Sequence, residues 1–147
     1  MSALGQQKTW SGYNTGITEL EFKSLENLIR KQAQTNAWFT LESVCLAFKA
    51  WGTLLTEENL SEWSSKYAWS SSPKRIGVIM AGNIPLVGFH DFLSVILSGN
   101  KVVIKLSSDD NSLIPALVSV LTNWNLELKE RIEISPYKLG EIDAIIA

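Results

Sequence analysis

Two short groups of polar residues in this chain could carry chemistry. The first is Asn83, which follows Gly82 and comes two residues before Pro85; the second is Lys105, followed by the hydroxyls of Ser107 and Ser108. A carboxamide can donate two hydrogen bonds, and donors held in place stabilise negative charge that develops on a reacting oxygen. A lysine followed by hydroxyls suits ribose hydroxyls or a phosphate.

Each group also has a purely structural interpretation. Asn83 could be only a helix N-cap or a turn residue. The segment 105–108 could be a solvated strand end that leads into a helix cap. The spacing of these residues alone leaves both interpretations open.

The surrounding pattern predicts that both groups lie at one edge of a sheet. Residues 76–80 and 101–106 form short apolar runs typical of buried strands. Pro85 fits the first turn of a helix that continues to Leu97, so Asn83 is expected at the positive end of that helix. Strand, helix and strand make a βαβ unit, and ligands bind at the carboxyl ends of such strands.

Helices are predicted before this unit, and further helices and strands after it. Apolar residues at helical spacing indicate three helices, capped by Thr18, Thr40 and Thr56. We therefore expect an α/β fold, with a helical segment (1–72) followed by half of a Rossmann-like parallel sheet (73–147). The remaining expected segments are an irregular arm (1–17), helices over 18–35, 41–55 and 57–69, a helix from the cap Asp109 to about 123, and strands over 131–135 and 142–147.

Composition excludes several classes of protein. The 147 residues are 46% hydrophobic and 19% charged, with a net charge of -2, which predicts a globular domain without a nucleic-acid surface. No apolar run is long enough to span a bilayer and no signal peptide is visible, so a cytoplasmic location is expected. Cys45 and His90 are single residues of their type, which argues against a cysteine or multi-histidine metal site.

The apolar and aromatic residues leave further alternatives open. Cys45 lies on the apolar stripe of a predicted helix and is expected to be a core residue. His90 and Asp91 are neighbours on a helix, so their side chains are expected to diverge, and His90 to be structural. The six tryptophans predict a tryptophan-rich core; alternatively they form a docking face or the wall of an apolar pocket.

The string Gly-Asn-Ile-Pro-Leu-Val-Gly-Phe-His-Asp-Phe (82–92), followed by Gly-Asn-Lys-Val-Val-Ile-Lys (99–105), carries a family resemblance. It resembles the long-chain acyl-CoA reductases of the bacterial bioluminescence operon, which belong to the aldehyde dehydrogenase superfamily. The resemblance is strong over residues 73–147 and fainter over the helices before them. The first string is quite specific to those reductases. The general superfamily pattern of Asn-x-Pro followed by Gly-Asn-x-Val-Val-x-Lys is also present.

That resemblance implies a function and assigns roles to particular residues. Such enzymes reduce a fatty acyl thioester to an aldehyde with NADPH through a cysteine acyl-enzyme. Asn83 matches the asparagine that holds the oxyanion. Lys105 matches the lysine that reaches the adenosine ribose or its 2′-phosphate, with Ser107 beside it. Ser108 replaces a glutamate of NAD-dependent relatives, which favours NADP, and Met80 and Ala81 match the backbone beneath the nicotinamide arm.

The resemblance also implies that parts of such an enzyme lie beyond this chain. The family's nucleophilic cysteine, its glutamate base and its catalytic domain come after the position matched by Ala147, and Cys45 does not match the nucleophile. We therefore expect an N-terminal portion of a longer reductase that is inactive alone, forms a homo-oligomer and acts with an acyl-CoA or acyl thioester substrate. The alternative is a non-catalytic binding module with a degenerate half-Rossmann fold.

Overall fold

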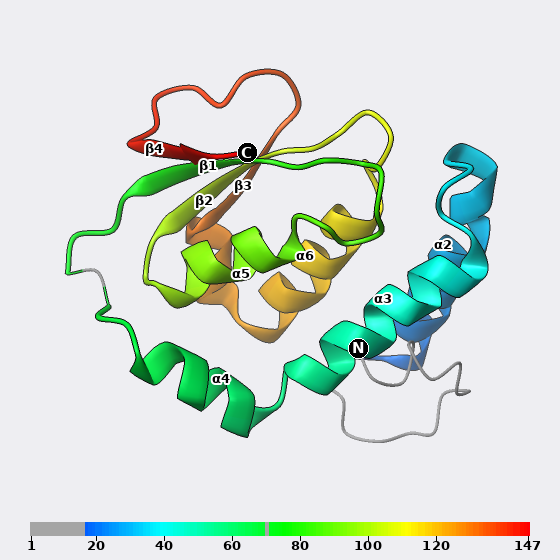
Figure 1. The fold of residues 1–147 in the computed structure, drawn as a ribbon, viewed down its shortest axis with the longest axis horizontal. Coiled ribbons are helices and arrows are strands. Elements are labelled where there is room, and N and C mark those ends of the chain that lie inside the picture. Colours follow the sequence, from blue (N-terminus) through cyan, green and yellow to red (C-terminus); the bar gives the residue numbers. More distant parts are fainter. Residues whose placement is uncertain (1–16, 70) are drawn as a thin grey trace.

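The computed structural model describes residues 17–69 and 71–147, in which helices precede a parallel sheet with its own helices (Figure 1). Of the predicted irregular arm, residues 1–16 lie outside the described residues. The elements in chain order are α2 (Glu19–Thr35), α3 (Leu41–Leu54), α4 (Glu57–Ser65), β1 (Arg75–Ile79), α5 (Phe89–Leu97), β2 (Lys101–Lys105), α6 (Leu113–Trp124), the short 3-10 helix η1 (Leu126–Glu130), β3 (Ile132–Ser135) and β4 (Ala144–Ile146).

The four strands form one parallel sheet in the order β3-β2-β1-β4. Residues Arg75 to Ile79 pair with Lys101 to Lys105, and Ile76 to Val78 pair with Ala144 to Ile146. A central first strand with the second and third on one side and the fourth on the other is the beginning of a doubly wound sheet. The predicted helical segment followed by a half-Rossmann-like sheet is thus confirmed.

The two faces of this sheet are covered differently. Side chains alternate between the faces, and those of Val78, Val102 and Ile104 join the main core with α5, α6 and the N-terminal helices. The opposite face is crossed by the connection 136–143, which Figure 1 shows on the far side of the sheet from α5 and α6. Gly77 makes room for it, because a Cβ there would lie 2.8 Å from Leu139 Cδ1.

The predicted caps of the first three helices are confirmed. The side-chain oxygens of Thr18, Thr40 and Thr56 each accept the backbone N–H three residues later. In α2 the Glu21 carboxylate also accepts the N–H of Thr18, which completes a capping box. The cap explains why each of these helices begins where it does.

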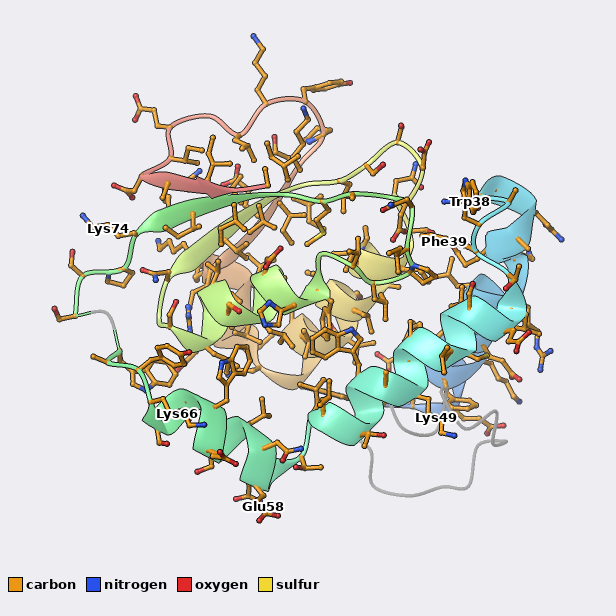
Figure 2. The ribbon with its side chains drawn as sticks, in the orientation of Figure 1. Trp38, Phe39, Lys49, Glu58, Lys66 and Lys74 are labelled. Carbon is orange, nitrogen blue, oxygen red and sulfur yellow. The ribbon has the colours of Figure 1, made fainter. Side chains whose placement is uncertain are left out.

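The third helix is shorter than expected, and the tryptophans do not form a core. We predicted that α4 would continue to Trp69, but it ends at Ser65 and none of its residues is buried. Trp38 and Trp69 are 75% and 61% exposed, and the large, fully buried aromatic side chains are all phenylalanines. Figure 2 shows exposed Trp38 beside buried Phe39 on the connection between α2 and α3. Trp51 and Trp63 are partly buried and pack against the core, and Trp10 lies outside the described residues. The described tryptophans therefore contribute to the core only at its margin, not at its centre as predicted.

Two predicted helix starts are also wrong. The helix expected from Pro85 begins at Phe89, because Leu86 has a φ of 62°, which no right-handed helix can include. The helix expected to be capped by Asp109 begins at Leu113, whose N–H is accepted by the carboxylate of Asp110. Both strands near the C-terminus are a little shorter than predicted. No helix among the described residues is long and apolar enough to cross a membrane.

Candidate functional site

The loops that follow β1 and β2 meet at the carboxyl edge of the sheet. The N–H of Met80 donates to the carbonyl oxygen of Lys105, so the ladder continues one residue beyond β1. The two loops are then so close that a Cβ on Gly82 would lie 2.5 Å from Ser107 Oγ and 2.9 Å from Asp109 Cβ. Only glycine fits this approach. The structure therefore brings the two predicted groups of polar residues to one place.

A strained turn follows Asn83. The N–H of Val87 donates to the carbonyl of Ile84 at 3.2 Å; with Pro85 second and Leu86 third at a φ of 62°, this pattern is that of a type II turn. A leucine in that conformation is strained, and such strain persists only where the surroundings hold it. Here Leu86 is buried to 1% exposure. Burial of Leu86 thus fixes the backbone that leads away from Asn83.

Asn83 itself lies on the surface with its carboxamide free. The residue is exposed, and within residues 17–69 and 71–147 its side chain makes no hydrogen bond. The N-cap interpretation is wrong, because α5 begins at Phe89 and its N-cap is Gly88. The expectation that Asn83 lies at the positive end of that helix is therefore wrong as well. What remains is a donor pair on a fixed backbone, the kind of group that can hold a developing oxyanion.

The other predicted site residues surround this point in different ways. Met80 is buried beneath Gly88, whereas Ala81 is exposed. Lys105 is exposed at the end of β2, on the sheet face opposite α5. The hydroxyls make local turn contacts: Ser107 Oγ accepts the N–H of Asp109 at 3.2 Å, and Ser108 Oγ donates to the Asp109 carboxylate at 3.3 Å. Both serines therefore lie at the edge and make hydrogen bonds within their own loop.

A buried asparagine that was not predicted from the sequence joins the two loops. Asn36, which ends α2, is 7% exposed. Its Nδ2 donates to the carbonyl of Gly82 at 2.8 Å and to that of Asp109 at 3.0 Å. A signal was available, since the buried stripe of α2 ends in Gln32 and Asn36, two polar residues at apolar spacing. A polar residue on such a stripe needs a partner.

A buried carboxylate completes the edge on the side of β2. Asp110 is 6% exposed, and this burial raises the pKa of its carboxyl above the ordinary 3.8. The N–H groups of Leu113 and Ser112 donate to it, which lowers its pKa in part. The carboxylate of Asp110 therefore accepts N–H groups at the start of α6, whose N-cap residue is Ser112, and holds the end of the loop that contains Ser107 and Ser108.

Two apolar hollows flank α4, and tryptophan side chains form part of the lining of each. The first, of about 470 Å³, lies between α4 and α5 and includes Trp63, Trp69 and His90. The second, of about 360 Å³, lies against α5 and α6 and includes Leu60 and Trp124. Their volumes are typical of small-molecule sites. The alternative of tryptophans as the wall of an apolar pocket agrees with this lining.

The remaining candidates have structural surroundings. Cys45 is 8% exposed in the core, as predicted. His90 stacks on Trp63 with ring centroids 5.6 Å apart. Its Nδ1 lies 3.3 Å from Asp91 Oδ1, so the prediction that these two side chains diverge is wrong.

The order of the four parallel strands defines this chain as an α/β protein with the beginning of a doubly wound sheet. A comparison with models of protein families identifies the family to which the chain belongs. The model of the family described as "Acyl-CoA reductase (LuxC)" matches residues 55–145, and the chain belongs to that family. Comparisons with curated proteins and with solved structures found no match. The matched segment contains Asn83, Lys105 and every other predicted site residue, whereas α2 and Asn36 precede it.

Proposed function

We propose that this chain is the cofactor-side portion of a reductase that converts a fatty acyl thioester into an aldehyde with NADPH, through an acyl-cysteine intermediate. Membership of the acyl-CoA reductase family supports the reaction class. The observation that carries the assignment of the site is the contact between the loops after β1 and β2, with Gly82 against Ser107. This contact supports the proposed roles, because the loops that carry Asn83 and follow Lys105 then lie at the same edge of the sheet.

In this proposal Asn83 donates hydrogen bonds to the thioester oxygen as that oxygen becomes negative. Its exposed carboxamide has no competing partner among the described residues, so both donors are available. The strained turn at Leu86 holds the following backbone in one conformation. A donor held before the reaction needs no reorganisation when charge develops. Cys45 does not serve as the nucleophile, because it is buried in the core.

The residues at the edge fit a nicotinamide cofactor. Lys105 is exposed and its ammonium can bind a ribose hydroxyl or a 2′-phosphate. Ser108 brings no charge of its own, although the Asp109 carboxylate lies 3.3 Å from its hydroxyl. Preference for NADPH over NADH therefore depends on Lys105. When bound, the cofactor supplies the hydride for the reduction.

The test is a titration of the chain with NADPH and with NADH, in which quenching of the tryptophan fluorescence measures binding. We expect NADPH to bind more tightly, and Lys105→Ala to weaken NADPH binding about tenfold or more by removal of a charge-assisted contact. The matched control is Lys101→Ala, because Lys101 is also exposed, on the same face of β2 but at its opposite end.

Equal loss in both lysine variants would mean that general positive charge, not a site, attracts the cofactor. Equal affinity for NADH and NADPH in the native chain would contradict the assignment of NADPH. A shift caused by Lys105→Ala alone supports the proposed edge.

A further inference from the structure

The carboxamide of Asn36 is fully used, and its partners fix its orientation. Its Nδ2 donates to two carbonyls, Gly82 and Asp109, and its Oδ1 accepts the N–H of Trp38 at 2.9 Å. Acceptors on one side and a donor on the other allow only one assignment of the amide. The residue's backbone is also paired, with Gln32 and Phe39. Asn36 is therefore held rigidly by α2 and by its own turn.

These hydrogen bonds reach the peptide units next to the proposed site. The carbonyl of Gly82 belongs to the same planar peptide as the nitrogen of Asn83, so fixing one fixes the other. The carbonyl of Asp109 likewise fixes the peptide that leads to Asp110, whose carboxylate accepts the N–H of Leu113 at the start of α6. One buried side chain thus ties the loop of Asn83 to the loop of Ser107 and Ser108. The two loops come from different strands and are held by a third element.

A second residue on the same face of α2 supports this arrangement. Gln32 is 3% exposed, and its Oε1 accepts the Ser112 hydroxyl at 3.1 Å. Among the described residues, the Gln32 side chain hydrogen-bonds to the loop after β2 and to its own helix, whereas Asn36 hydrogen-bonds to both loops. Asn36 is therefore the residue whose loss would free the two loops from one another.

We infer that Asn36 is a positioning residue of the reductase, which acts through Asn83 by holding the Gly82 carbonyl against the loop after β2. This inference rests on the proposed function for the role of Asn83. It extends the proposed active site to the end of α2, which precedes the residues matched by the family model (55–145). A misplacement of about 1 Å at a reacting group can cost about 10²-fold in rate, so such a clamp matters to turnover.

The first test measures the clamp itself in the native chain, by NMR. We expect the Nδ2 protons of Asn36 to exchange slowly with solvent and those of exposed Asn83 to exchange freely. In Asn36→Ala the amide resonances of residues 82–83 and 109–110 should move. The control Thr122→Val should leave them in place, because Thr122 is equally buried but its hydroxyl bonds only within α6. Fast exchange of the Asn36 carboxamide would overturn the inference, and this measurement needs no variant to fold.

The second test is a double-mutant cycle in the complete reductase. Asn36→Ala should lower kcat about 10- to 100-fold with little change in KM. In an Asn83→Ala background the same change should add no further loss, because the group it positions is gone. An equal further loss in that background would overturn the inference. Normal turnover of Asn83→Ala alone would reject the proposed function instead, and the NMR result would still decide whether Asn36 is the clamp.

Discussion

Two asparagines at the same sheet edge have opposite surroundings. Asn83 is exposed and its carboxamide is free within the described chain, whereas Asn36 is buried and all its donors are used. A free donor pair beside a fixed backbone is available to a reacting group, and a saturated one can only hold structure. Under the proposed function, Asn83 therefore takes part in the reaction, whereas Asn36 holds the backbone around it.

The role of Asn83 predicts a kinetic effect without a structural one. In the complete reductase Asn83→Ala should lower kcat about 10²–10³-fold, as removal of one oxyanion donor does. Because the side chain is exposed and makes no hydrogen bond to a described residue, the melting temperature should stay within error. Steady-state kinetics and thermal unfolding measure the two quantities. Asn27→Ala, an exposed asparagine on α2, is the control, and normal turnover of the Asn83 variant would refute the role.

At the scale of elements, the sequence predicts what depends on local pattern. The strands and their parallel arrangement follow from the alternation of apolar runs with helices. The starts of the first three helices follow from capping residues, as at Thr18. The start of α5 does not, because Pro85 is equally suited to the first turn of a helix and to the second position of a type II turn. Burial of Leu86 decides between them, and burial is a property of the whole fold.

The candidate site was predictable to a similar extent. Adjacent parallel strands bring Asn83 and Lys105 to one edge, and this follows from the order of elements alone. The bond from Asn36 to Gly82 joins residues far apart in the sequence, so no local pattern specifies it. Similarly, either Asp109 or Asp110 could by residue type accept an N–H at the start of a helix. Only the path of the loop determines that Asp110 accepts the N–H of Leu113.

The buried carboxylate of Asp110, at the start of α6, leads us to predict a pH dependence of stability. Because burial raises the pKa of Asp110 in the folded chain, the folded state binds its proton more tightly than the unfolded state does. This contribution is fully present below the ordinary pKa of 3.8 and is lost as pH rises through the folded pKa. Asp110→Asn keeps an oxygen for the Leu113 N–H but cannot ionise. Its stability relative to the native chain should therefore increase with pH above about 3.8.

Urea unfolding over a series of pH values measures this difference. Asp109→Asn is the control, since Asp109 is the exposed neighbour in the same loop. A stability difference between Asp110→Asn and the native chain that is constant with pH would contradict the prediction.

At the scale of the whole molecule, apolar surface remains exposed around the last strand. Ile145 on β4 is 57% exposed and Ile79 on β1 is 40% exposed. In the described part of the chain β4 pairs only with β1, so its outer edge is open. Open edges with exposed apolar residues favour pairing with another chain.

We therefore predict that the chain forms a homo-oligomer through β4. Ile145→Lys should weaken self-association about tenfold or more, because it places a charge on the open edge. Sedimentation at several concentrations measures this. Leu20→Lys changes an exposed leucine on α2 and should have no effect. A chain that is monomeric at every concentration, or equal association of both variants, would refute the prediction.

The pairing of β4 with β1 also sets an order of events during synthesis on the ribosome. β1, α5 and β2 are neighbours in sequence and can pair as soon as they emerge, whereas the other side of β1 must wait for residues 144–146. Closure of so long a loop is entropically costly and comes late. The edge with Asn83 and Lys105 can thus form in a nascent chain whose central strand is still open on one side.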